Sequence, residues 1–263
     1  MSRFCSLYSS SKGNSTYIGT SSGGILIDAG KSCKCLCESL KNIGVAPSSI
    51  QAIFITHEHS DHKTALRLFA DKFHTKVYAT GGTLASLERS GDLNGDFDTD
   101  IMTQDGICVG EMMIKSFKTS HDCAEGCGYT VYMPDGRKIS VAMDTGIVTE
   151  EMLESVKGSD LILLESNYDG FMLTHGRYPQ SLIDRISSDL GHLSNDVCAR
   201  AAAYFVSTGT TRLILGHLSE NNNRPELAFG TTKRALNAMG ASEGRDYFLK
   251  VAKPRGTPEM LLL

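Results

Sequence analysis

The chain has 263 residues, of which 41% are hydrophobic and 21% are charged, and this is enough to build one large domain. Its formal net charge of −4 argues against a dedicated nucleic-acid binder with a broad basic groove, although a small site in which metal ions supply the positive charge stays compatible. No apolar stretch approaches the roughly 20 residues that cross a bilayer, and the first six residues lack the apolar core of a signal peptide. We therefore expect a cytoplasmic protein that makes no membrane contact.

Apolar runs bounded by turn residues predict strands, and amphipathic segments predict helices, along the whole chain. A buried strand begins at Ile25 and leaves through a tight turn at Gly30, and a helix follows to about Ile43. Further strands are expected at 52–56, 76–79, 112–117, 129–133, 138–143, 161–164, 212–215 and 247–252. Further helices are expected after residue 62, with Ala65, Leu66, Leu68 and Phe69 pointing inward, and at 82–89, 149–157, 178–189, 195–207 and 225–239, whereas 90–100 should be a surface loop.

This order of elements predicts the fold class. Strands come first in clusters and then alternate with helices, in both halves of the chain, which favours two packed sheets with helices outside. The chain has six prolines and no Pro- or Ser-rich linker. We therefore expect a single α/β domain over residues 1–263, built as a four-layer αββα sandwich.

The eight cysteines fit a cytoplasmic protein if they are thiols. Cys33, Cys35 and Cys37 resemble a metal-binding trio. However, Cys33 and Cys37 follow the helical period together with Leu36 and Leu40, which favours packing on one helix face.

The motif with the most specific chemistry is His57-x-His59-x-Asp61-His62. It follows the apolar strand at 52–56, so imidazoles and a carboxylate stand on a loop at a strand end, and these are the ligand types of catalytic zinc. One ion cannot easily take all four groups, which favours two adjacent ions. The alternative is a polar loop that starts a helix, but three histidines in six residues are poor capping residues.

Other metal-type residues also follow predicted strands: His121, Asp144, Glu165 and His217. Groups carried on loops at one edge of a rigid sheet are the recurrent layout of α/β enzymes. We assign His57, His59 and His121 to one ion, Asp61, His62 and His217 to a second ion, and Asp144 to a bridging position between them. Two ions would hold a shared hydroxide ready at neutral pH, and nitrogen and oxygen ligands suit zinc or manganese.

Together these residues resemble the metallo-β-lactamase superfamily. The resemblance covers nearly the whole chain, through Asp28 in Leu-Ile-Asp-Ala-Gly, the histidine loop, His121, Asp144 in Asp-Thr-Gly, and His217. It implies the same αββα fold and the same metal roles. Asp28 is expected to fix a ligand imidazole through its second nitrogen rather than to bind a metal. A β-lactamase activity is disfavoured, because the zinc β-lactamases most often carry a cysteine where Asp144 stands.

Four further segments, 165–167, 176–179, 191–195 and 217–222, resemble the YycJ/WalJ group within that superfamily. The group is regarded as 5′-to-3′ DNA exonucleases, related to RNase Z. The opening loop at 9–15 also resembles the group but departs from it at Ser9 to Lys12, where Lys12 takes a glycine's place, which puts phosphate contacts by this loop in doubt.

The resemblance implies a phosphodiesterase in which a metal-bridging hydroxide attacks phosphorus. His192 is expected to protonate the leaving group, and Glu165 to orient it, because a neighbouring carboxylate keeps imidazolium protonated near pH 7. Asp61, His192 and Glu165 are therefore the predicted catalytic residues. The alternative for His192 is a residue that merely starts a helix near Ser194.

Predicted substrate-binding residues are Arg177, Ser194, Asn221 and Asn222. Arg177 could clamp a phosphate or be a surface charge, and the asparagines could hold phosphate, order the His217 loop, or form a polar turn. The expected partner is nucleic acid, with DNA favoured over RNA, and no obligate protein partner can be read from the sequence. The alternative functions are an RNase Z-like RNA-processing nuclease, an ester, thioester or lactone hydrolase that does not require the His192–Glu165 pair, and a metal-bound module without turnover.

Overall fold

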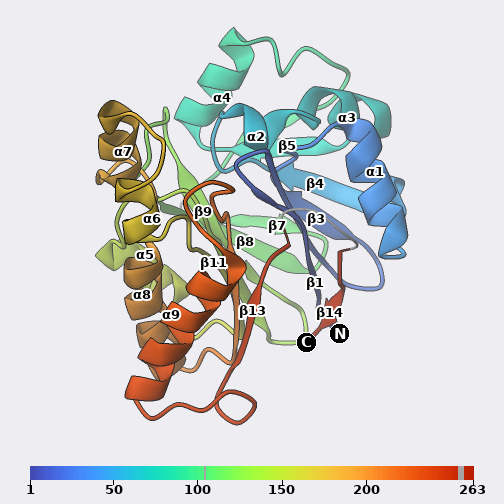
Figure 1. Ribbon diagram of the computed structural model, residues 1–263. Coiled ribbons are helices and arrows are strands. Elements are labelled where there is room, and N and C mark those ends of the chain that lie inside the picture. The colour runs from blue at the N-terminus through green and yellow to red at the C-terminus, as the bar shows by residue number, and fades with distance from the viewer. Residues whose placement is uncertain (104, 254–257) are drawn as a thin grey trace. The chain divides into compact units, whose positions relative to one another are not determined.

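The computed structural model describes residues 1–103, 105–253 and 258–263, which fall into two compact units (Figure 1). Unit 1 comprises Met1–Ser116, Cys123–Arg137 and Lys253–Leu263, and unit 2 comprises Phe117–Asp122 and Lys138–Ala252. Among the described residues, no helix combines the length and the apolar character needed to cross a membrane.

Unit 1 is built on a mixed seven-stranded sheet with the strand order β14-β1-β2-β3-β4-β5-β6. Strands β1 to β3 pair antiparallel, and β3 to β6 pair parallel. The strands are β1 (Arg3–Ser10), β2 (Gly13–Gly19), β3 (Gly24–Ile27), β4 (Ile50–Phe54), β5 (Lys76–Ala79), β6 (Thr99–Ile101) and β14 (Leu261–Leu262).

The sequence analysis missed the β1–β2 hairpin and β6, which begins inside the expected loop at 90–100. The hairpin is hard to recognise in the sequence, because small polar residues, many of them serines, occupy its buried positions. Ser9, Ser10 and Ser15 are all buried, and Ser15 Oγ donates to the Asp28 carbonyl oxygen at 2.8 Å. A hydrogen bond of this kind lets a polar residue stand where an apolar residue would give the usual strand pattern.

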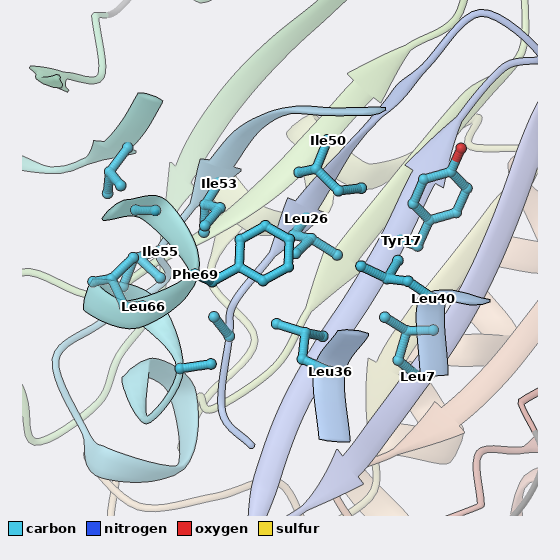
Figure 2. Packing of buried hydrophobic residues seen from close by; sticks show 14 of the residues in the cluster. Leu7, Tyr17, Leu26, Leu36, Leu40, Ile50, Ile53, Ile55, Leu66 and Phe69 are labelled. Atoms are coloured by element: carbon cyan, nitrogen blue, oxygen red, sulfur yellow. The ribbon is translucent and has the colours of Figure 1, made fainter. Parts of the chain in front are cut away.

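Helices α1 (Cys33–Asn42), α3 (Leu66–Phe73) and α4 (Gly81–Arg89) pack against one face of this sheet. Figure 2 shows the Phe69 ring among Leu26, Ile53 and Leu36, all of which are fully buried. Cys33 and Cys37 pack against the same core and Cys35 is exposed, as their helical spacing predicts.

Leu68 does not point inward as predicted, because 57% of its surface is exposed. Ala65, Leu66, Phe69 and Ala70 already form the buried stripe of α3, and the 3.6-residue period turns Leu68 away from that stripe.

The opposite face of the sheet is also covered within unit 1. Strands β7 (Ile107–Val109), β8 (Met112–Lys118) and β9 (Cys127–Tyr132) lie in the order β9-β8-β7. Tyr129 packs edge-on against Phe54, with ring centroids 5.5 Å apart, and donates its hydroxyl to the Ile55 carbonyl oxygen at 2.7 Å. A sheet that is buried on both faces is what an αββα sandwich requires.

Unit 2 contains four parallel strands in the order β13-β12-β11-β10. They are β10 (Lys138–Ala142), β11 (Leu161–Glu165), β12 (Arg212–Gly216) and β13 (Phe248–Val251), and the central residues of β10, β11 and β12 are buried. Helices α5 (Glu150–Val156), α8 (Asn195–Ser207) and α9 (Pro225–Ala238) pack on this sheet, with α8 and α9 side by side (Figure 1). Two shorter helices, α6 (Gly170–Thr174) and α7 (Gln180–Ser187), lie between β11 and α8 in the chain.

We expect Phe69→Ala to lower the free energy of unfolding by about 3–5 kcal/mol, because the substitution removes a buried ring and leaves a cavity between α3 and the sheet. Urea denaturation followed by circular dichroism measures this. Leu68→Ala on the same helix is the matched control and should change stability by only about 0.5 kcal/mol. Equal losses in the two variants would contradict the packing described here.

Candidate metal centre

Three histidine rings gather in unit 1 directly after β4. The chain bends at Thr56 and Glu58 before it reaches His59, the N-cap residue of the short helix α2 (Ser60–Lys63). The His57 ring centroid lies 4.6 Å from that of His59 and 4.1 Å from that of His62. His57 and His62 are buried, whereas His59 is half-buried. The loop therefore brings together the rings of the three predicted histidine ligands of unit 1.

The carboxylate of Asp28 fixes the imidazole of His62 through a hydrogen bond with its Nδ1 nitrogen. Asp28 follows β3 and takes a left-handed backbone conformation, with φ of 62°. His62 Nδ1 donates to Asp28 Oδ2 at 2.8 Å, and the Thr56 backbone N–H donates to Asp28 Oδ1 at 2.8 Å. Burial raises the pKa of Asp28, and the contacts with His62 and Thr56 oppose that rise. Because Nδ1 of His62 holds a proton, its Nε2 keeps the lone pair that a metal ion needs.

Asn14, at the start of β2, contacts the same side chains. Its Nδ2 donates to His62 Nε2 at 3.0 Å and to Asp61 Oδ2 at 3.1 Å, and these two acceptor atoms are 3.4 Å apart. Ligand atoms that bind one ion at about 2.0–2.2 Å lie at a similar separation, so the donor types and their spacing fit a divalent cation. The sequence analysis gave Asn14 no role, and its place in the loop at 9–15 is the only signal that points to it.

The close approach of these segments depends on Gly30. Its backbone N–H donates to the Asn14 carbonyl oxygen at 2.8 Å. A Cβ atom at this position would lie 1.6 Å from the Asp61 carbonyl oxygen, so no side chain fits. Glycine therefore lets the exit of β3, the β1–β2 turn and the histidine loop meet backbone to backbone.

In unit 2, Asp144, Glu165 and His217 stand at the carboxyl ends of β10, β11 and β12. These strands are parallel neighbours, so their ends share one edge of the sheet. His217 Nδ1 lies 2.7 Å from Asp144 Oδ1 and 3.5 Å from Glu165 Oε1. Together with His192, these residues offer ligand-type atoms that all lie within 4.8 Å of one another.

Buried Glu165 and half-buried His192 form an ion pair at this edge. His192 Nδ1 donates to Glu165 Oε1 at 2.7 Å, and the Thr145 backbone N–H donates to Glu165 Oε2 at 2.9 Å. Burial lowers the pKa of His192, but the charges of Glu165 and Asp144 and the Glu165 hydrogen bond outweigh burial and raise the pKa above its usual value. With Nδ1 committed to Glu165, Nε2 carries the proton that His192 can give away.

His121 lies in the same unit, with its ring centroid 5.0 Å from that of His192. Its Nδ1 donates to the Gly191 carbonyl oxygen at 3.0 Å, which leaves Nε2 as the atom available to a metal. Burial lowers the pKa of His121 and keeps the ring neutral, the form that binds a metal ion.

A network of buried amides joins the loops that carry these groups. Asn223 Nδ2 donates to the carbonyl oxygens of Ser166 and Asn167 at 2.9 and 3.0 Å, and Asn195 Nδ2 donates to Asn223 Oδ1 at 3.0 Å. Asn167 Nδ2 in turn donates to the His217 carbonyl oxygen at 2.9 Å. The network ties the segment after Glu165 to the segment after His217.

The predicted substrate-binding residues have different surroundings. Arg177 is exposed. Ser194 is the N-cap of α8 and accepts from the Val197 N–H at 3.2 Å. Asn221 Nδ2 donates to the Tyr178 hydroxyl at 2.9 Å, and Asn222 is only 1% exposed. Of the four, Arg177 and Asn221 are exposed to solvent, whereas Asn222 is buried.

The family model described as the beta-lactamase superfamily domain matches residues 24–218. The exodeoxyribonuclease YycJ of Bacillus anthracis is 35% identical over 256 residues, which cover 96% of each chain. The exodeoxyribonuclease WalJ of Streptococcus pneumoniae is 36% identical over 252 residues, which cover 93% of this chain and 92% of that protein.

Solved structures agree on the fold. The metallo-β-lactamase fold protein YhfI of Bacillus subtilis matches with a TM-score of 0.74 at 14% identity, over 100% of both chains. The Zn²⁺-bound PqqB of Methylobacterium extorquens matches with a TM-score of 0.73 at 15% identity, over 99% of this chain and 100% of that one. The predicted αββα fold is confirmed, and the chain belongs to the metallo-β-lactamase superfamily and, within it, to the group that contains YycJ and WalJ.

Proposed function

We propose that this chain is a dinuclear metal-dependent phosphodiesterase and acts as a 5′-to-3′ DNA exonuclease, with both units forming one metallohydrolase domain. The observation that carries the proposal is the 2.7 Å contact between Glu165 and His192, beside Asp144 and His217. A histidine whose pKa is raised by a neighbouring carboxylate, next to a metal-type cluster, suits the protonation of an alkoxide that leaves phosphorus. The YycJ and WalJ relatives, both named exodeoxyribonucleases, support DNA as the substrate.

The proposed metal ligands are those of the sequence prediction: His57, His59, Asp61, His62, His121, Asp144 and His217. Their nitrogen and oxygen donors, without thiolate, suit zinc or manganese. When bound, two such ions would neutralise the phosphate oxygens and lower the pKa of a shared water. Asp28 and the Gly191 carbonyl oxygen would set the tautomers of His62 and His121, as described above.

The remaining chemistry belongs to side chains of unit 2. Glu165 keeps His192 protonated, and His192 delivers the proton from Nε2 to the departing oxygen. The Thr145 N–H holds Glu165 in place through its second oxygen. We propose that Arg177 contacts a phosphate of the substrate, whereas direct substrate contacts by Ser194, Asn221 and Asn222 stay predictions, as does a cytoplasmic location.

We expect a small-molecule ester, thioester or lactone hydrolase to use the same metal ligands but not to require the Glu165–His192 pair. An RNA-processing nuclease would need the pair as well, so only the choice of substrate separates it from the proposed DNA exonuclease.

We expect Asp144→Ala to abolish nuclease activity, because the substitution removes the predicted bridging carboxylate. The assay uses DNA duplexes labelled at the 5′ or the 3′ end, with Mn²⁺ or Zn²⁺, and the equivalent RNA. Mononucleotide release from the 5′ end by the wild type alone is the expected result. Cleavage of RNA only would move the chain to RNA processing, and cleavage of neither, with metals bound, would overturn the phosphodiesterase proposal.

His192→Ala should lower kcat on DNA by about 10²–10⁴-fold, the usual contribution of a positioned acid, while the metal content stays that of the wild type. Steady-state kinetics and elemental analysis of the purified variant measure the two quantities. His74→Asn is the matched control, since the His74 side chain is 70% exposed and lies in unit 1. Turnover at the wild-type rate in His192→Ala would remove His192 from the mechanism.

Glu165→Gln should move the alkaline limb of the kcat–pH profile to lower pH. In the wild type, Glu165 raises the pKa of His192, so His192 stays protonated to higher pH. Glutamine keeps a hydrogen-bond acceptor but removes the charge, so the pKa of His192 falls and the acid is lost sooner as pH rises. An unmoved limb, or one moved to higher pH, would contradict the role of Glu165.

A further inference from the structure

Helix α6 presents two stacked aromatic rings that the proposed mechanism does not use. The rings of Phe171 and His175 have centroids 4.1 Å apart and an interplanar angle of 17°. Phe171 is 70% exposed and His175 is also exposed, whereas Leu173 on the same helix is buried. The helix is therefore anchored through Leu173 and holds a nearly parallel ring pair, one turn apart, in solvent.

The ring pair is close in the chain to the proposed acid. Tyr168 forms a parallel β-bridge with Ser194, which stands two residues after His192. Phe171 follows Tyr168 by three residues, so their Cα atoms can be at most about 11 Å apart. The same segment is tied to the His217 loop, because the Asp169 backbone N–H donates to the Asn222 carbonyl oxygen at 2.8 Å.

The ring pair also has a fixed support. Asp169 caps α6 by accepting from the Met172 N–H at 2.9 Å. Beyond the helix, Asn221 Nδ2 donates to the Tyr178 hydroxyl at 2.9 Å. Between these contacts, a Cβ atom at Gly176 would lie 2.7 Å from the Met172 carbonyl oxygen and 3.0 Å from Asn222 Oδ1, so the chain turns tightly there. Asn221 and Asn222 therefore brace the segment that carries the rings.

We propose that Phe171 and His175 form a stacking platform for one nucleobase, that of the nucleotide whose oxygen leaves from phosphorus and takes the proton of His192. The inference rests on the proposed function and adds a base-binding subsite to it. Flat aromatic rings bind any of the four bases through their faces, so the platform gives affinity without sequence preference. The exposed Arg177, two residues after His175, supplies a cation for the adjoining phosphate.

A protein or membrane partner is a poorer match for this surface. The platform consists of two rings on a five-residue helix, and it is followed by a charged residue rather than by further apolar side chains. Its size suits a single flat ring system, which is what an exonuclease must hold each time it removes one nucleotide.

The first test compares substrates with a normal or an abasic terminal nucleotide at the end that the enzyme attacks. The abasic end should raise KM of the wild type about tenfold. Phe171→Ala should raise KM on the normal substrate by a similar factor and should be insensitive to the abasic change, while its thermal stability stays near that of the wild type. Phe248→Ala, which removes another exposed phenylalanine of unit 2, should behave as the wild type.

Two outcomes of this test would overturn the platform. In the first, Phe171→Ala keeps the wild-type KM on the normal substrate. In the second, the KM of Phe171→Ala still rises tenfold when the terminal nucleotide is abasic, which would mean that the base binds elsewhere. A lowered melting temperature with unchanged KM would mean that the ring pair only stabilises α6.

The second test needs no catalysis, because the chain contains no tryptophan. Phe171→Trp introduces a single tryptophan, whose fluorescence can be excited apart from that of the nine tyrosines. A short oligodeoxynucleotide without added metal should quench this fluorescence, whereas the same oligomer of abasic residues should not. Phe248→Trp is the control and should stay unquenched. Equal quenching by the abasic oligomer would contradict base stacking. If the oligodeoxynucleotide quenches Phe171→Trp but the enzyme cleaves no DNA, the proposed activity is overturned and the platform stands. If Phe171→Ala cleaves DNA with the wild-type KM, the platform is overturned and the proposed activity stands.

Discussion

Parallel hydrogen bonding holds the ends of β10, β11 and β12 side by side, and the first polar groups beyond these apolar strands are Asp144, Glu165 and His217. The hydrophobic residues of each strand are buried between layers, and this burial fixes the position of the last residue of each strand. The polar groups at the strand ends are not needed to hold that position. The pairing of Glu165 with His192 and the approach of Asp144 to His217 both follow from this register. A slip of one residue in β11 would turn Glu165 to the other face of the sheet.

The rigid strands also sustain unfavourable backbone conformations at the residues of interest. Asp28, Asp144 and His217 have φ values of 62°, 51° and 54°, in the left-handed region that residues other than glycine rarely adopt. Such conformations cost on the order of 1–3 kcal/mol each and persist where the surrounding structure fixes them. In each case the residue comes directly or almost directly after a buried strand.

The parts of the molecule that the sequence predicted are those in which residue type alone carries information. Histidine is rare, so the motif at 57–62 indicated a metal site without any knowledge of the fold, and apolar runs located the strands that precede Asp144, Glu165 and His217. Serine and asparagine carry less information, because they are common in turns. The serine-rich hairpin of β1 and β2 was missed for this reason, and so were the roles of Asn14 and Asn195, which depend on segments that meet only in the folded chain. Leu68 was placed wrongly because its hydrophobicity was weighed above its position on the helix.

The amide network around Asn223 has a consequence for how the enzyme could move. Asn223 Nδ2 holds the carbonyl oxygens of both Ser166 and Asn167, and Asn167 holds that of His217, so neither loop can open alone without leaving buried polar groups unsatisfied. The loops after β11 and β12 should therefore open together or not at all, with a high local unfolding free energy. A substrate or product that passes on this side would therefore meet two loops that cannot move independently of each other.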